Sequence, residues 1–314
     1  MIRAYGLTKH YGGKPVKKAV DDLGFEVLPG TVTGFLGPNG AGKSTTMRML
    51  LGLDAPTRGR STIGDRAYTT HPAPLHEVGA LLEARSVHPG RSAYNHLMAL
   101  AHTHSIPKSR VDAVLDLAGI HDVAHRRVKG FSLGMGQRLG IAAALLGDPA
   151  TVILDEPVNG LDPEGVLWIR NLLKSLAAEG RTVLVSSHLM SEMALTAEHL
   201  IIIGRGRLLA DTTVERFVRE SGTGAVKVVT PEAGVLSELL AGPGVEITVD
   251  TPGTLDVRGT DAEHIGRTAA THGIPLFELT PHAASLEQAF MDLTRDSVEY
   301  VASTSLPQPE GAAA

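Results

Sequence analysis

The sequence predicts an α/β protein with a mainly parallel sheet, a helical insertion and a smaller α+β domain toward the C-terminus. Short apolar runs alternate with helical patterns over the first two thirds of the chain, as expected for parallel strands that helices cover on both faces. The runs are VTGFL at 32–36, TVILDEP at 151–157, TVLVSSH at 182–188 and HLIIIG at 199–204. We expect these four runs to form the buried sheet.

Composition places the chain among globular proteins and limits its function. It has 314 residues, 43% hydrophobic and 20% charged, which is enough for one large or two ordinary domains. The net charge of −5 argues against general nucleic-acid coating, so no nucleic-acid partner is expected. The absence of cysteine excludes disulfides and thiolate metal sites. No apolar run is long enough to span a bilayer, and the N-terminal residues lack the apolar core of a secretion signal.

The helical parts of the first domain follow from 3.6-residue periodicity. The segment 165–178 predicts a helix between two of the buried strands. Residues 84–130 are rich in Ala and His, with helical spacing at 92–104 and 109–120 and no buried-strand run. We therefore expect a helical insertion at about 84–130 within a domain of residues 1–220.

A second domain is expected at 221–298. It follows a Gly- and Ser-rich linker at 221–225 and precedes a tail at 299–314 whose composition predicts disorder. The order of elements is β-α-β-β-α-β, the split βαβ pattern of ferredoxin-like folds, followed by a final amphipathic helix. The segments in order are 225–230, 231–240, 245–250, 254–259, 261–272, 275–280 and 285–294.

A phosphate-binding loop lies between the first predicted strand and a predicted helix. Its pattern is G-x-x-x-x-G-K-S, which in this context is typical of a P-loop NTPase core. Successive backbone N–H groups and the helix N-terminus would face the anion. Lys43 would bridge the β- and γ-phosphates, and the Ser44 hydroxyl would bind Mg²⁺. The predicted nucleotide-binding residues are Gly37, Pro38, Asn39, Gly40, Ala41, Gly42, Lys43, Ser44 and Thr45.

Two adjacent carboxylates follow the strand at 151–154. The carboxyl ends of parallel strands are where ligands bind in open α/β sheets. Asp155 suits a metal ligand, directly or through water, and Glu156 suits a general base that polarises the attacking water.

These motifs and their order resemble the nucleotide-binding subunit of ABC transporters from about Tyr11 to His188. The resemblance implies that Tyr11 stacks on adenine and that His188 contacts the γ-phosphate. It also implies ATP and Mg²⁺ as cofactors and ATP hydrolysis as the activity. Lys43, Glu156 and His188 are then the expected catalytic residues, and Ser44 and Asp155 the expected metal ligands.

Residues 131–137, FSLGMGQ, resemble the signature loop of that family, usually LSGGQ. The expected nucleotide contacts in this loop are Ser132, Gly134, Gly136 and Gln137. In the family, the signature of one subunit covers the ATP bound by the other. The loop ending at Asp162 matches the segment that crosses between subunits. The resemblance therefore implies a dimer of two copies with two nucleotides between them.

Two positions depart from the family pattern. Leu133 replaces the usual Gly or Ser, and Glu83 stands where many members carry Gln. The Gln position would contact Mg²⁺ and the attacking water, so Glu83 is a predicted nucleotide and metal contact. The segments VGALLEA, SLGMGQRLGIA and SLEQAF, together with the C-terminal domain, resemble the antibiotic-efflux branch that confers bacitracin and lantibiotic resistance.

The expected function is that of an ATPase subunit that energises export of a drug, antibiotic or peptide. A separate transmembrane permease would be the partner, and the chain would sit peripherally on the cytoplasmic face of the membrane. One alternative is a soluble ABC-type ATPase that acts on DNA or ribosomes. A GTPase or small-molecule kinase is disfavoured because no N-K-x-D motif is present. Glu156 disfavours a module that binds ATP without hydrolysing it.

Overall fold

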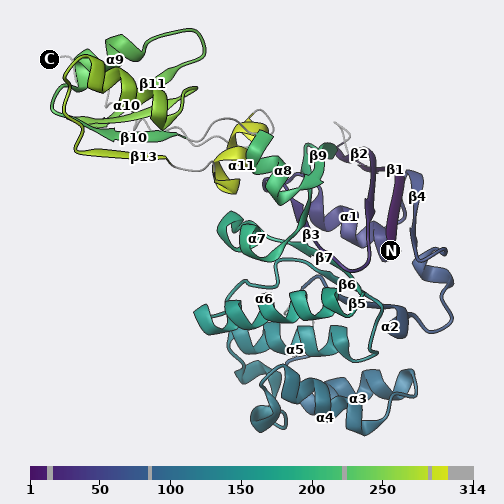
Figure 1. Cartoon of the computed structure of the whole chain (residues 1–314). Helices are drawn as coiled ribbons and strands as arrows, with labels where there is room; N and C mark the ends of the chain where they lie inside the picture. The colour runs from purple at the N-terminus through teal and green to yellow at the C-terminus, as the bar shows by residue number, and fades with distance from the viewer. Residues whose placement is uncertain (13–16, 84–86, 221–224, 282–284, 296–314) are drawn as a thin grey trace, which may run out of the picture. The chain divides into compact units, whose positions relative to one another are not determined.

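The computed structural model describes residues 1–12, 17–83, 87–220, 225–281 and 285–295. These residues form two compact units (Figure 1). One comprises residues 1–188 and 201–211, and the other comprises residues 189–200 and 212–293. The linker at 221–224 and the tail at 299–314 lie outside the described residues. The expected boundary between residues 220 and 221 stays a prediction.

The larger unit is built on a six-stranded sheet with the order β5-β6-β7-β3-β8-β9. Three of the predicted apolar runs, β3, β6 and β7, pair in parallel, and β5, which lies outside those runs, pairs in parallel with β6. β3, β6 and β7 are buried along their whole length. Their bounds are β3 Val32–Leu36, β5 Val78–Leu81, β6 Thr151–Leu154, β7 Thr182–Ser186, β8 His199–Gly204 and β9 Arg207–Thr213.

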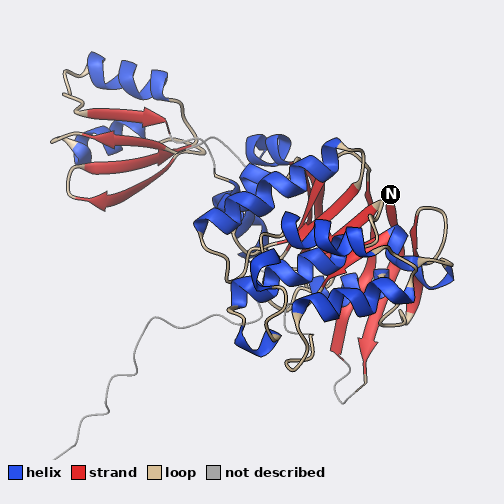
Figure 2. Cartoon of the chain, turned by 90° about the horizontal axis from the view of Figure 1, so that it is seen from below, coloured by secondary structure: helices blue, strands red, loops and turns tan. Residues whose placement is uncertain are grey.

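Helices cover this sheet and build the predicted insertion. Figure 2 shows the blue helices of the larger unit in front of its red strands. In the insertion, α3 and α4 pack against each other and against α5, which also packs on β5. The helices are α1 Lys43–Leu50, α2 Pro74–Glu77, α3 Ala93–Thr103, α4 Lys108–Leu117, α5 Leu133–Leu145 and α6 Pro163–Ala178. Among the described residues, no helix combines the length and apolarity needed to cross a membrane.

A second, antiparallel sheet in the larger unit was not apparent from the apolar runs. Its order is β2-β1-β4, with bounds Lys17–Val27, Ile2–Tyr11 and Arg58–Ile63. β1 has exposed and buried residues interspersed, and β4 has Ile63 as its one apolar residue, so neither strand contains a continuous apolar run. The buried residues of β1 and β2 join α1 in one hydrophobic cluster. The carboxyl end of β1, which carries Tyr11, is thereby held beside α1.

The smaller unit contains the predicted β-α-β-β-α-β order. Its four-stranded antiparallel sheet has the order β11-β12-β10-β13, and α9 and α10 pack on it around one apolar cluster. The fourth strand starts at Glu278 and not at the predicted residue 275. The elements are α7 Met190–Thr196, α8 Val214–Glu220, β10 Val226–Val229, α9 Ala233–Leu240, β11 Glu246–Thr251, β12 Thr254–Arg258, α10 Ala262–Thr271, β13 Glu278–Pro281 and α11 Leu286–Thr294.

The close approach of β5 to α5 generates a prediction about stability. A Cβ atom on Gly79 would lie 1.9 Å from the carbonyl oxygen of Ala144, and a helix backbone cannot move aside cheaply. We expect Gly79→Ala to destabilise the protein by about 1–3 kcal/mol, measured by urea denaturation. Gly130→Ala is the matched control, because a Cβ there meets nothing within 4 Å. Equal midpoints for the two variants would contradict the packing described here.

Candidate active site

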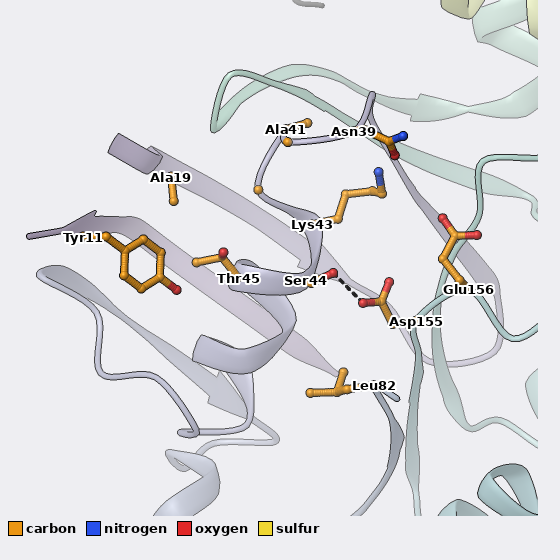
Figure 3. Close-up of a pocket in the computed structure, with 12 residues that line it drawn as sticks. Tyr11, Ala19, Asn39, Ala41, Lys43, Ser44, Thr45, Leu82, Asp155 and Glu156 are labelled. Carbon is orange, nitrogen blue, oxygen red and sulfur yellow. Dashed lines mark hydrogen bonds between the residues drawn. The ribbon is translucent and has the colours of Figure 1, made fainter. Parts of the chain in front are cut away.

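A cavity of about 500 Å³ lies at the carboxyl ends of the parallel strands. In Figure 3, Tyr11 lies at one end of this cavity and Glu156 at the other, with the loop after β3 between them. The lining residues are Tyr11, Ala19, Asn39, Gly40, Ala41, Gly42, Lys43, Ser44, Thr45, Leu82, Asp155 and Glu156. Its size is in the range of small-molecule and cofactor sites. The structure therefore brings together the phosphate loop, both carboxylates and Tyr11, which lie far apart in the sequence.

The loop between β3 and α1 has a backbone that glycine alone adopts without strain. Gly42 has a φ of +103°, and a Cβ there would lie 2.5 Å from the carbonyl oxygen of Ala19. Its own carbonyl accepts the first bond of α1, from the N–H of Thr46 at 2.9 Å. The free N–H groups of the first helical turn therefore open toward the cavity, and an anion there interacts favourably with the helix dipole.

The Lys43 side chain forms hydrogen bonds within the phosphate-binding loop. Its ammonium group donates to the carbonyl oxygen of Gly37 at 2.6 Å and to that of Pro38 at 3.3 Å. The residue is only 9% exposed. Burial lowers the pKa of Lys43, and the negative charges of Glu156 and Asp155 oppose that shift. The cation is thus paired with carbonyl dipoles, and a phosphate offers it a stronger partner.

Ser44 and Asp155 present the oxygens expected of a magnesium site. The Ser44 hydroxyl donates to Oδ2 of Asp155 at 2.6 Å (Figure 3). Hydroxyl and carboxylate oxygens are the ligands that Mg²⁺ takes, usually one or two from the protein and the rest from phosphate and water. No group of three or more acidic or His side chains that could hold a metal by itself occurs among the described residues. The donor set therefore fits Mg²⁺ bound together with a nucleotide.

Five hydrogen bonds join Glu156 to Asn159 in its own loop, to α5 and to the segment from Ser186 to His188, and the N–H of Asn159 donates to the Glu156 carbonyl oxygen at 3.2 Å. Its φ is +50°, a left-handed conformation that is uncommon for a non-glycine residue. Its N–H donates to the Ser186 hydroxyl at 2.9 Å, and its carbonyl oxygen accepts from the Gln137 amide at 3.0 Å. Its carboxylate contacts Nδ1 of His188 at 2.7 Å and the His188 backbone N–H at 3.3 Å. The predicted general base and His188, the predicted γ-phosphate contact, are therefore in direct contact.

Ser186 was missed by the sequence analysis. Its hydroxyl donates to Oδ1 of Asp155 at 2.5 Å while it accepts the N–H of Glu156. The side chain is fully buried at the end of β7. The sequence feature that could have identified Ser186 is its position two residues before His188, at the end of an apolar strand. One serine thus contacts the carboxylate of Asp155 and the backbone of Glu156.

Tyr11 is tied to α1 through Asp54. The ring is 39% exposed at the cavity mouth, and its hydroxyl donates to Oδ2 of Asp54 at 3.2 Å. The same oxygen accepts from Nε of Arg48 on α1 at 2.8 Å. The Lys9 ammonium lies 5.3 Å from the ring centroid. This position is compatible with stacking on a base whose phosphates occupy the loop, and the stacking role stays a prediction.

The signature residues do not line the cavity of their own chain. Ser132 caps α5 by accepting from the N–H of Met135 at 3.2 Å. Ser132, Leu133 and Gly136 line a separate pocket of about 370 Å³. Their predicted contact with nucleotide would therefore need a second chain, as the resemblance implies.

Close packing joins the signature to the loop after Glu156. A Cβ on Gly134 would lie 2.8 Å from the carbonyl oxygen of Gly160, and a Cβ on Gly160 would lie 2.3 Å from Leu133. The Leu133 side chain, at a position where the family usually has Gly or Ser, therefore occupies the space that a Cβ on residue 160 would need. Asp162 caps α6 by accepting from the N–H of Gly165 at 2.9 Å. Its predicted contact with nucleotide stays a prediction.

Glu83 lies next to the cavity. The preceding residue, Leu82, lines the cavity, and Glu83 itself is exposed beyond the end of β5. The backbone N–H of Asp155 donates to the carbonyl oxygen of Leu81 at 2.7 Å, which ties this strand end to the metal site. Residues 84–86 lie outside the described part of the chain. The contact of Glu83 with Mg²⁺ stays a prediction.

Two families match the chain. Residues 20–159 match the family described as ABC transporter, and residues 224–287 match one described as a domain of unknown function. The first match includes the phosphate loop and the two carboxylates. The second covers most of the β-α-β-β-α-β domain.

Relatives match over most of the chain. An uncharacterized ABC transporter ATP-binding protein, YhcH of Bacillus subtilis, is 36% identical and covers 96% of this chain and 98% of its own. The bacitracin transport ATP-binding protein BcrA of Bacillus licheniformis is 42% identical over 70% of this chain and 72% of its own. The solved dimer of the ATP-binding cassette MJ0796 with ADP and Pi shares the fold, with a TM-score of 0.63, 24% identity, and coverage of 68% of this chain and 99% of that one. With these relatives and this cavity, the chain belongs to the ATP-binding proteins of ABC transporters.

Proposed function

We propose that this chain is the ATP-binding and ATP-hydrolysing subunit of an ABC transporter that exports a drug, antibiotic or peptide through a separate permease. The observation that carries the proposal is the convergence of Lys43, Ser44, Asp155 and Glu156 in one cavity. The export direction is supported by relatives described as bacitracin transport and lantibiotic transport ATP-binding proteins, the latter SrtF of Streptococcus pyogenes, 34% identical over 67% of this chain and 90% of its own. None of the relatives named here is described as acting on DNA or ribosomes.

Each residue at the carboxyl edge of the sheet has a defined task. Lys43 and the N–H groups at the start of α1 bind and orient the phosphates. Ser44 and Asp155 would hold Mg²⁺, which would neutralise phosphate charge when bound. Glu156 accepts the proton of the attacking water as general base. His188, in contact with Glu156, would hold that carboxylate and contact the γ-phosphate.

The signature supports a shared site between two copies of the chain. Since Ser132 and Gly136 lie outside their own chain's cavity, a second copy would supply them to the γ-phosphate end. ATP bound at both cavities would then stabilise the closed dimer, and hydrolysis would reopen it. The free energy available for work is the difference between the free energies of nucleotide binding to the closed and open states. The helical insertion, α3 and α4, would pass this motion to a permease at the cytoplasmic face of the membrane.

Replacement of Lys43 tests nucleotide binding. We expect Lys43→Ala to weaken ATP binding about 10- to 150-fold and to abolish turnover, because a charge-assisted contact contributes about 1.5–3 kcal/mol. ATP affinity and phosphate release measure this. Lys174→Ala, which removes an exposed cation from α6, is the control. Wild-type turnover by Lys43→Ala would overturn the proposed function.

Replacement of Glu156 separates binding from chemistry. We expect Glu156→Gln to bind ATP but to hydrolyse it about 10²–10⁴-fold more slowly, since an amide cannot accept the proton of water. Because the closed dimer opens only after hydrolysis, this variant should accumulate as a dimer with MgATP on size-exclusion chromatography. Glu179→Gln, at an exposed site after α6, is the control. A monomer at saturating MgATP would argue against the shared site.

Glu83 tests the link between chemistry and the permease. A carboxylate accepts hydrogen bonds and carries charge, so it approaches the γ-phosphate favourably only with Mg²⁺ present. We expect Glu83→Ala to keep ATP binding but to lose permease-stimulated hydrolysis and transport. The assay is ATPase activity with and without the permease across a Mg²⁺ titration. If stimulation and metal dependence match those of the wild type, Glu83 is a surface residue without this role.

A further inference from the structure

We infer that Gln137 is a positioning residue for Glu156 of its own chain, so that the signature helix controls the alignment of the general base. The inference deepens the proposed function and rests on the role of Glu156 as base. It assigns Gln137 a different task from the nucleotide contact that the sequence suggests. Three observations carry it: the burial of Gln137, the backbone conformation of Glu156, and the packing between their segments.

Gln137 is not placed to meet a ligand at the protein surface. It is 3% exposed, although it lies within the first two turns of α5 and five residues after the helix cap Ser132. Its amide Nε2 donates to the carbonyl oxygen of Glu156 at 3.0 Å. If this buried amide turned toward a nucleotide, it would lose its hydrogen bond to the backbone. That bond compensates the cost of burying the amide. The geometry therefore favours a role inside the chain.

The bond falls on a residue whose conformation needs support. Glu156 has a φ of +50°, and a non-glycine residue holds such a conformation only when its surroundings fix it. The Ser186 hydroxyl fixes the N–H, and Gln137 and the N–H of Asn159, at 3.2 Å, share the carbonyl oxygen. The bonds to its N–H and to its carbonyl oxygen together hold the backbone of Glu156 in this conformation, which sets the direction in which the side chain leaves the loop. Gln137 therefore acts on the direction of the carboxylate through the backbone.

The helix that carries Gln137 packs closely against the loop after Glu156. The first turn of α5 and Gly160 are in such close contact that neither Gly134 nor Gly160 has room for a Cβ. A shift of α5 along its axis would therefore press on this loop and on the Glu156 carbonyl at the same time. In the proposed dimer, the partner's ATP binds at the N-terminus of α5. Binding at that end would then be felt at the general base of the other site, which couples the two hydrolysis steps.

The test uses the full chain with Gln137→Leu and Gln137→Glu. Both variants keep the approximate volume of the side chain. Leu cannot donate the hydrogen bond, and Glu cannot donate it when ionised. Circular dichroism and the melting temperature establish that both variants are folded. We expect kcat to fall about tenfold, as for the loss of one buried hydrogen bond, with the KM for ATP within twofold of the wild type. A loss of nucleotide contact would raise KM instead.

A second measurement distinguishes a role of Gln137 within its own chain from a contact with the partner's nucleotide. In the Glu156→Gln background, ATP-driven dimer formation is followed by size exclusion as the MgATP concentration is varied. If Gln137 acts through Glu156, adding Gln137→Leu leaves the concentration for half-maximal dimer unchanged and lowers the residual rate no further. Adding Ser132→Ala should raise that concentration, because Ser132 caps the helix end that faces the partner's nucleotide.

The outcomes distinguish the inference from the proposed function. Wild-type kcat in both Gln137 variants would overturn the inference, as would a rise in the dimerisation concentration equal to that caused by Ser132→Ala. Wild-type turnover of Glu156→Gln alone would overturn the proposed function, whatever the Gln137 variants do. A tenfold lower kcat with unchanged dimerisation supports the positioning role.

Discussion

Parallel pairing of β3, β6 and β7 is the constraint on which the site depends. In the register of these strands, Phe35 lies opposite Ser186, and Leu154 lies opposite Val185. The next residues along each strand leave the sheet at the same level. The phosphate loop, the two carboxylates and Ser186 therefore meet at one edge, although 111 residues separate Ser44 from Asp155. A slip of one residue would turn these side chains to other faces of the sheet.

The buried sheet also sets the electrostatics of the site. Because β3, β6 and β7 are covered on both faces, Lys43 and Asp155 lie at the border between an apolar interior and the cavity. Burial lowers the pKa of Lys43, and the negative charges of Glu156 and Asp155 oppose that shift. A cation and two carboxylates at the edge of a low-dielectric interior interact more strongly than they would in water. The site is thus arranged for a charged ligand before the ligand arrives.

The same edge links binding to movement. Glu156 donates a hydrogen bond to Ser186 of β7 and accepts one from Gln137 of α5, so the base is attached both to the sheet and to the helix that begins at the signature. The insertion helices α3 and α4 pack on α5. A displacement of α5 is therefore transmitted in two directions, toward the general base and toward the insertion. This arrangement gives a physical basis for coupling between hydrolysis and a permease.

The sequence by itself determined the parts whose chemistry is local. The loop from Gly37 to Thr45 was predictable because its glycines and Lys43 are contiguous, and the apolar runs predicted the parallel strands because burial on both faces requires them. The order of elements in the smaller unit was likewise predictable from periodicity. The antiparallel sheet β2-β1-β4 was not, since neither β1 nor β4 contains a continuous apolar run.

Only the tertiary structure decided which distant residues act together. The sequence suggested Gln137 as a nucleotide contact, but packing of α5 buries its amide against Glu156. Ser186 gave no signal beyond its place before His188, and its role follows from pairing of β7 with β6. Asp54 became a partner of Tyr11 because the turn after α1 returns to β1. Hydrogen bonds between segments far apart in sequence depend on strand register and helix packing, and no local pattern of residues encodes them.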